Sequence, residues 1–300
     1  TKVEILRQLM QGTKVIVIDP EREYKRLTES VNGTYIKLSA KSKQKVNPFD
    51  LATTFHKISD LSEHAQDLTE VISLMAEGLS SREKAAVDKA ILKIYKKVKN
   101  QQPLLEDLYA ELQSLGQLKL CERLEKYISG SLADVFNAQT NIKLDNRLVI
   151  FDIKDLPESL RQIMMLIISN FVKNQVMAKP EKRLLIIDEG WMLLEHEESA
   201  RFVAGLVRRA RKYYLGVSII SQQANDFLRS DYGRAIASQS ALRILMRQDT
   251  TTIKNVVSEF NLSEYEQGFL LTCERGDALI IADQNHVAVK VVASEKEHPL

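Results

Sequence analysis

The sequence predicts an α/β fold in which a mostly parallel sheet has helices on both faces and an all-α subdomain is inserted into it. Short β-branched and apolar runs recur along the chain, which indicates buried strands. Helical patterns separate these runs, as the crossover connections of a parallel sheet require. From about residue 53 to 128 the pattern is helical only, which predicts the insertion.

The first predicted element is a helix, whose apolar residues end before Gly12. Strands are then expected, in chain order, at residues 15–18, 148–152, 184–187, 217–220, 241–246 and 277–282. The last of these should form a hairpin with 287–292. Helices expected at 157–177 and 198–212 make the middle strands successive βα units of one sheet.

The helical stretch carries its own apolar faces. Val87, Ile91 and Ile94 recur at helical spacing, and Ser80 with Glu83 has the spacing of a capping box. We interpret these apolar faces as subdomain core rather than as grooves for a partner. The predicted division is therefore a sheet domain of residues 1–52 and 129–300, and a helical insertion of residues 53–128.

Composition limits the class of protein. The residues are 44% hydrophobic and 27% charged, which is typical of globular proteins, and the net charge is only +2. That balance excludes a strongly basic nucleic-acid coat but leaves a local basic patch open. No apolar run approaches the roughly 20 residues that span a bilayer. Cys121 and Cys273 belong to no metal-binding cluster, so two reduced thiols in a cytoplasmic protein are expected.

Two adjacent carboxylates, Asp188 and Glu189, directly follow the buried strand 184–187. Charge is costly to desolvate, and the carboxyl edge of a parallel sheet faces the crevice where ligands bind. This is the Walker B arrangement, in which the first acid holds Mg²⁺ through its water shell and the second orients or deprotonates the attacking water. The alternative is a strand that runs into an acidic, solvated turn.

Three further residues have two interpretations each. Gln222 follows the next strand, where an amide can hold the lytic water or sense a γ-phosphate, although polar strand ends are common. Arg211 lies in a basic run that closes the intervening helix. The run is either a solvated helix end, favoured by the macrodipole, or an arginine finger for a neighbouring subunit's nucleotide. Asp19 either belongs to the nucleotide site, near Mg²⁺ or facing the substrate, or caps the turn that follows it.

Four segments together resemble one known family. They are Ile18-Asp19-Pro20-Glu21-Arg22-Glu23-Tyr24, Asn47-Pro48-Phe49-Asp50, Ile187-Asp188-Glu189-Gly190-Trp191, and Ala210-Arg211-Lys212 followed by Ser221-Gln222. Each is weak alone, but the set is specific and covers nearly the whole chain. It resembles the large ATPases of type IV secretion systems, the TraC-like conjugation ATPases within the HerA–FtsK superfamily of ring motors.

The resemblance implies a RecA-like P-loop NTPase core that hydrolyses ATP with Mg²⁺. It implies a homo-hexamer or related ring, peripherally bound at the inner face of the cell membrane, with other secretion-system subunits as partners and DNA or a DNA–protein complex as substrate. The motor would energise pilus assembly and substrate transfer. By position, Asp188 would coordinate Mg²⁺ through water, Glu189 would be the catalytic base, Gln222 would sense the γ-phosphate, and Arg211 would be the trans finger.

The chain departs from the family in one respect. No G-x-x-x-x-G-K-[ST] phosphate loop is present among the 300 residues. In the family this loop precedes the helix that leads to Ile18-Asp19-Pro20, so we expect it on the N-terminal side of Thr1. The 300-residue chain by itself is expected to bind ATP poorly.

Two other functions remain open from the sequence. A DNA translocase of the FtsK or HerA type shares the catalytic residues and would bind DNA with a steep salt dependence. A catalytically silent docking fragment is favoured by the missing phosphate loop. The Asp188–Glu189 pair and Gln222 argue against such a fragment.

Overall fold

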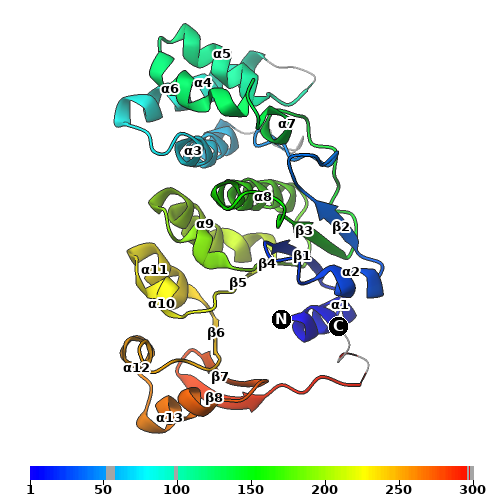
Figure 1. Ribbon diagram of the computed structural model, residues 1–300, viewed down its shortest axis with the longest axis vertical. Helices are drawn as coiled ribbons and strands as arrows, with labels where there is room; N and C mark the ends of the chain where they lie inside the picture. Colours follow the sequence, from blue (N-terminus) through cyan, green and yellow to red (C-terminus); the bar gives the residue numbers. More distant parts are fainter. Residues whose placement is uncertain (52–57, 98–100, 296, 298–300) are drawn as a thin grey trace.

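The computed structural model describes residues 1–51, 58–97, 101–295 and 297. At its centre lies a wholly parallel, five-stranded sheet with the strand order β2-β3-β1-β4-β5 (Figure 1). Its strands are β1 (Lys14–Asp19), β2 (Thr34–Lys37), β3 (Leu148–Asp152), β4 (Arg183–Ile187) and β5 (Leu215–Ile219). The predicted α/β class is confirmed.

Helices cover both faces of this sheet (Figure 1). Ile16 and Ile18 of β1 belong to one apolar cluster, together with residues of α8 and α9. Val15 and Val17 belong to a second cluster, together with residues of α1 and α2. Because both faces are buried, the strand is apolar throughout, which is why its sequence predicts it. The covering helices are α1 (Lys2–Met10), α2 (Lys25–Ser30), α8 (Glu158–Ala178) and α9 (Glu197–Ala210).

The helical region stacks on the outer side of α8 and α9 (Figure 1). It contains α3 (Ile58–Met75), α4 (Ser81–Lys97), α5 (Leu105–Ser114), α6 (Leu118–Leu124) and the 3₁₀ helix η1 (Glu125–Tyr127). The predicted capping box is present, since Ser80 N donates to Glu83 Oε2 at 2.8 Å. One continuous apolar cluster joins these helices to the sheet. The predicted boundary between residues 52 and 53 lies outside the described residues, so the domain division stays a prediction.

Helix α8 runs between the sheet and the helical region (Figure 1). Its buried residues include the polar Lys173 and Asn174. Lys173 Nζ contacts both Glu63 and Asp67 of α3 at 2.5 Å. In the part of the chain that the structure describes, no helix combines the length and the apolar character needed to cross a membrane.

The C-terminal strands form a separate antiparallel sheet with the order β6-β7-β8. The strands predicted at 241–246 and 277–282 are present as β6 and β7, but the sequence did not indicate that they form a second sheet. Leu245 and Leu279 pack in a cluster of their own with Leu270, and a short apolar run does not specify which sheet it enters. The elements are β6 (Leu242–Leu245), α12 (Ile253–Phe260), α13 (Glu264–Thr272), β7 (Asp277–Ala282) and β8 (Asn285–Lys290).

The predicted hairpin is confirmed, because β7 and β8 pair antiparallel. Only Asp283 and Gln284 separate the two strands, and so short a loop allows no parallel crossover. Strand β2 was not predicted. It has four residues, of which only Ile36 is buried, and such a run carries little apolar signal. Short helices complete the described chain: α7 (Ala133–Phe136), α10 (Asn225–Leu228) and α11 (Asp231–Gln239).

Candidate active site

The ends of the parallel strands bring the predicted site residues to one edge of the sheet. Asp19 ends β1, and Asp188 follows β4 directly. The backbone N–H of Asp188 donates to the carbonyl of Ile18 at 3.2 Å, which fixes the two strand ends side by side. On the other side of β4, Ile220 N donates to the carbonyl of Ile187 at 2.9 Å. Asp188, Glu189 and Gln222 therefore share the carboxyl edge.

Glu189 and Gln222 are in direct contact. Gln222 Nε2 donates to Glu189 Oε1 at 2.7 Å. Trp191 Nε1 donates to Glu189 Oε2, also at 2.7 Å. Both carboxylate oxygens thus accept a hydrogen bond from a neutral donor. The two donors hold the Glu189 side chain in one orientation, and neither donor is charged.

The backbone of Glu189 adopts the left-handed conformation, with φ 49° and ψ 41°. A residue with a Cβ pays about 1–3 kcal/mol for a sparsely populated backbone conformation, and such residues gather at functional sites. The next residue, Gly190, begins the 3₁₀ helix η2 (Gly190–Leu193) and donates its N–H to the carbonyl of Ile220 at 2.7 Å. A Cβ at Gly190 would lie 2.3 Å from Cγ2 of Ile219, so only glycine fits this close approach.

Asp188 is buried, and its carboxylate accepts two hydrogen bonds. Oδ1 accepts from the N–H of Glu189 at 3.1 Å, and Oδ2 accepts from the phenol of Tyr24 at 2.8 Å. The pKa of Asp188 is raised, mainly by burial. The hydrogen bonds from Tyr24 and Glu189 act in the opposite direction and lower this pKa. Among the described residues Asp188 forms no ion pair. A buried carboxylate without a cationic partner suits a bound cation.

Asp19 is fully buried beside Asp188. Its two oxygens accept from the backbone N–H groups of Glu23 at 3.0 Å and of Tyr24 at 3.1 Å. This is the turn-capping geometry, one of the two interpretations that the sequence allowed. Burial raises the pKa of Asp19, and the nearby charges of Asp152 and Asp188 add to the increase.

These carboxylates fit a magnesium ion that is bound mainly through water and phosphate. Mg²⁺ usually binds through one or two carboxylates, several waters and the phosphates of a nucleotide. Within the described ranges no group of three or more His, Cys, Asp or Glu side chains is placed to hold a metal directly. One buried carboxylate at the end of β4, that of Asp188, fits the water-mediated mode better than a cage of protein ligands.

Arg211 lies at the other end of the sheet. It begins the 3₁₀ helix η3 (Arg211–Tyr213), which precedes β5 at the amino end of that strand. Its side chain is exposed. The structure therefore does not bring Arg211 together with Glu189 and Gln222 within one chain.

Sequence reasoning did not assign roles to two polar residues at the same carboxyl edge. Asp152 ends β3 in register with Asp19, and it accepts from Tyr35 Oη at 2.7 Å and from Arg22 Nε at 2.6 Å. A signal for it exists, since the apolar runs of β1, β3 and β4 are each followed by Asp. Tyr24 carries no comparable signal, because its contact with Asp188 spans 164 residues of sequence.

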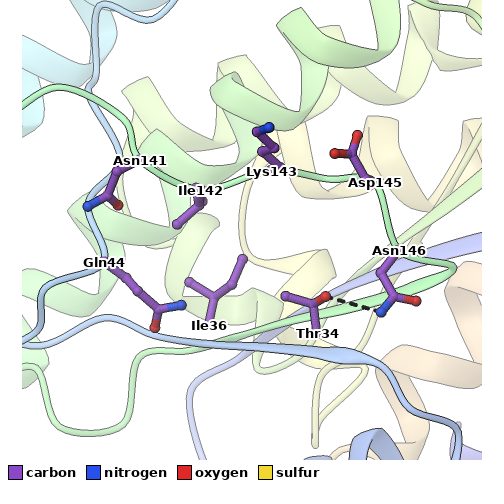
Figure 2. Close-up of a pocket in the computed structure, with 8 residues that line it drawn as sticks. All are labelled: Thr34, Ile36, Gln44, Asn141, Ile142, Lys143, Asp145 and Asn146. Carbon is purple, nitrogen blue, oxygen red and sulfur yellow. Dashed lines mark hydrogen bonds between the residues drawn. The ribbon is translucent and has the colours of Figure 1, made fainter.

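One pocket of the described chain lies away from this edge. It has a volume of about 550 Å³ and is lined by residues of β2, by Gln44 and by residues of the segment 141–146 (Figure 2). Its amides already have partners within the chain: Gln44 Oε1 accepts from the N–H of Lys37, and Asn146 Nδ2 donates to Thr34 Oγ1. No residue of the Asp188–Glu189 edge lines it. We do not assign this pocket to the site.

The family model that matches residues 1–280 is described as an AAA-like domain. The chain belongs to the AAA-like domain family. It is 26% identical over 204 residues to the type IV secretion system protein VirB4 of Bartonella quintana, a match that covers 62% of this chain and 26% of the relative. It is 24% identical over 274 residues to TraC of Escherichia coli K12, covering 80% of this chain and 30% of the relative. This AAA-like chain spans about a quarter to a third of the length of these relatives.

Solved structures give the same grouping. VirB4 of Thermoanaerobacter pseudethanolicus superposes with a TM-score of 0.87 at 27% identity, covering 99% of this chain and 86% of that one. The plasmid coupling protein TrwB in complex with ADP and Mg²⁺ has a TM-score of 0.64 at 12% identity, covering 97% and 81% of the two chains. At that identity the likeness to TrwB concerns the fold alone. The resemblance to type IV secretion ATPases seen in the sequence is thus confirmed.

Proposed function

We propose that this chain is the nucleotide-hydrolysing part of a type IV secretion ATPase and couples ATP hydrolysis to pilus assembly and substrate transfer. The observation that carries the proposal is the contact of Gln222 with Glu189 beside the buried Asp188, at the carboxyl edge of a parallel sheet. The similarity to VirB4 and TraC supports it. The family match over residues 1–280 adds the domain class.

In this proposal each residue acts through the geometry described above. Glu189, held by two neutral donors, accepts a proton from the attacking water or orients it. Gln222, on the adjoining strand end, is the neutral group next to that base and senses the γ-phosphate. Asp188 would hold Mg²⁺ through water, and Asp19, which caps the turn after β1, would lie near the ion. When bound, Mg²⁺ neutralises charge on the phosphates of ATP.

The proposal extends to assembly. Arg211 lies at the opposite end of the sheet from its own Glu189, so a role as an arginine finger requires a neighbouring copy. We therefore propose a homo-hexamer or related ring in which Arg211 approaches the nucleotide of the next subunit. Such a ring would work at the inner face of the cell membrane with other secretion-system subunits, on DNA or a DNA–protein complex.

The test is ATP hydrolysis by the full-length protein with Glu189→Gln. We expect turnover to fall by about 100-fold or more, because general base catalysis contributes about 10²–10⁴ in rate. Binding of ATP should persist, since the amide preserves the shape of the side chain. The matched control is Glu195→Gln, which makes the same change at an exposed residue in the same segment and should leave turnover unchanged.

Two outcomes would contradict the proposal. Equal turnover in the Glu189→Gln and wild-type proteins would remove Glu189 from its role as base. Absence of any ATP hydrolysis by the wild-type protein, assayed with its secretion partners, would favour a docking module that has kept the fold without the chemistry.

A further inference from the structure

Tyr24 connects the two strand-end carboxylates of the candidate site. It lies directly before α2, and its side chain is only 2% exposed. Its backbone N–H donates to Asp19 Oδ2 at 3.1 Å, and its phenol donates to Asp188 Oδ2 at 2.8 Å. Tyr24 therefore donates one hydrogen bond to Asp19, which ends β1, and a second to Asp188, which follows β4.

The two contacts have different consequences for the site. The N–H of Tyr24 belongs to the turn that Asp19 caps together with the N–H of Glu23, so it fixes the position of the tyrosine. The phenol then reaches across to the next strand. The other oxygen of Asp188 accepts from the N–H of its own neighbour, Glu189. The phenol is thus the side-chain donor that determines how the Asp188 carboxylate is rotated.

Asp19 and Asp188 are buried neighbours of the same charge. Like charges repel strongly where water is excluded, and an unrestrained carboxylate would turn away from its neighbour. Donors from a third residue, directed to both carboxylates, hold them together at the strand ends. Outer groups that orient a metal-binding side chain act in this way in many metal sites.

We propose that Tyr24 is a positioning residue for magnesium: its phenol orients the Asp188 carboxylate toward the water shell of the ion. The inference rests on the proposed function, since it assumes that Asp188 serves Mg²⁺·nucleotide. Tyr24 touches neither ion nor nucleotide in this scheme. It acts through Asp188.

The test is Tyr24→Phe in the full-length protein, with binding of a fluorescent ADP analogue measured as Mg²⁺ is titrated. Phenylalanine keeps the buried ring and removes only the hydroxyl, so the turn should persist, and thermal unfolding checks this. We expect the half-saturating Mg²⁺ concentration to rise about tenfold or more, the usual effect of losing an outer-shell partner. Binding of the analogue in EDTA should not change.

The matched control is Tyr35→Phe. Tyr35 also donates a phenol to a strand-end aspartate, Asp152, at 2.7 Å, but on the β2 side of the sheet. The half-saturating Mg²⁺ concentration of the Tyr35→Phe variant should equal that of the wild type. An unchanged value in Tyr24→Phe, or an equal rise in both variants, would overturn the inference alone. A wild-type protein whose nucleotide binding does not depend on Mg²⁺ would also overturn this inference, whereas a wild-type protein that hydrolyses no ATP would overturn the proposed function with it.

Discussion

At the scale of single residues, the site is notable for how Glu189 is restrained. Its left-handed backbone is unfavourable for a residue with a Cβ, yet two side-chain hydrogen bonds hold it there. One donor, Gln222, comes from the next strand end. The other, Trp191, lies two residues along the chain, so the local turn supplies half of the restraint.

Replacing the indole donor should affect chemistry more than binding. In Trp191→Phe the aromatic ring remains, but Glu189 Oε2 loses the hydrogen bond of 2.7 Å. A base with a freer side chain is poorly aligned with its water, so we expect kcat of the full-length protein to fall about tenfold, an estimate based on the contribution of a positioned base. Single-turnover hydrolysis measures this. The Kd for ATP should remain as in the wild type, and an unchanged kcat would show that Gln222 alone suffices.

At the scale of elements, the turn after β4 depends on its close packing against β5. Gly190 donates its N–H to the carbonyl of Ile220, and its Cα faces the side chain of Ile219. The same turn carries Glu189. Packing between two strand ends therefore sets the position of the proposed base.

Alanine at Gly190 should disrupt this packing. The added Cβ would meet Cγ2 of Ile219 at 2.3 Å, and overpacking of this kind costs about 1–3 kcal/mol. Urea unfolding of the full-length protein measures the loss, which the second change Ile219→Ala should partly restore by making room. Gly268→Ala is the control: no atom lies within 4 Å of its added Cβ, and alanine in the exposed helix α13 should add about 0.4–1 kcal/mol. Equal stability in the two alanine variants would contradict the packing argument.

The same elements show how far the sequence predicts this fold. β1, β3 and β4 are buried on both faces, so their apolar runs identify them without knowledge of their partners. Strand β2 is half-exposed at the sheet edge and gives no such run. Membership of β6 in the second sheet depends on which cluster its side chains enter, and periodicity does not encode that.

The residues of the candidate site likewise differ in whether the sequence predicts them. Asp188, Glu189 and Gln222 could be predicted because they follow recognisable strands, and parallel strands align their carboxyl ends. The roles assigned to them remain predictions, as does that of Arg211. Tyr24 could not be predicted, because its contact depends on how the turn after β1 folds toward β4. The hydrogen bond from Trp191 to Glu189 could not be predicted either, because the sequence shows only that the two residues lie in one segment.

At the scale of the whole molecule, a partly buried charge cluster joins the helical region to the helices that cover the sheet. Lys173 of α8 contacts Glu63 and Asp67 of α3, and Glu63 also contacts Arg209 of α9 at 3.0 Å. The side chain of Lys173 is only 5% exposed. Because α8 packs directly on the sheet, this cluster is a polar link between the helical region and the layer that carries the site.

Removing the buried cation should loosen that link. In Lys173→Met the carboxylate of Asp67 stays buried without its partner, and breaking a buried pair costs about 3–5 kcal/mol. Burial already raises the pKa of Asp67, and loss of Lys173 should raise it further. The pKa of Asp67 is then higher in the folded chain than in the unfolded chain. As the pH rises above the unfolded pKa, Asp67 ionises more easily in the unfolded chain, and the free energy of unfolding falls. The deficit should therefore be larger at pH 8 than at pH 5.

Hydrogen exchange of the α3 amides, with urea unfolding at both pH values, measures this effect. Exposed Lys89→Met in α4 is the control and should change neither. The double variant Lys173→Met with Asp67→Leu should recover most of the lost stability, because Glu63 keeps Arg209 while the unpaired carboxylate is gone. The opposite outcome is a double variant that is as unstable as the single one. Packing around the aliphatic part of Lys173, rather than its charge, would then join the helical region to the helices that cover the sheet.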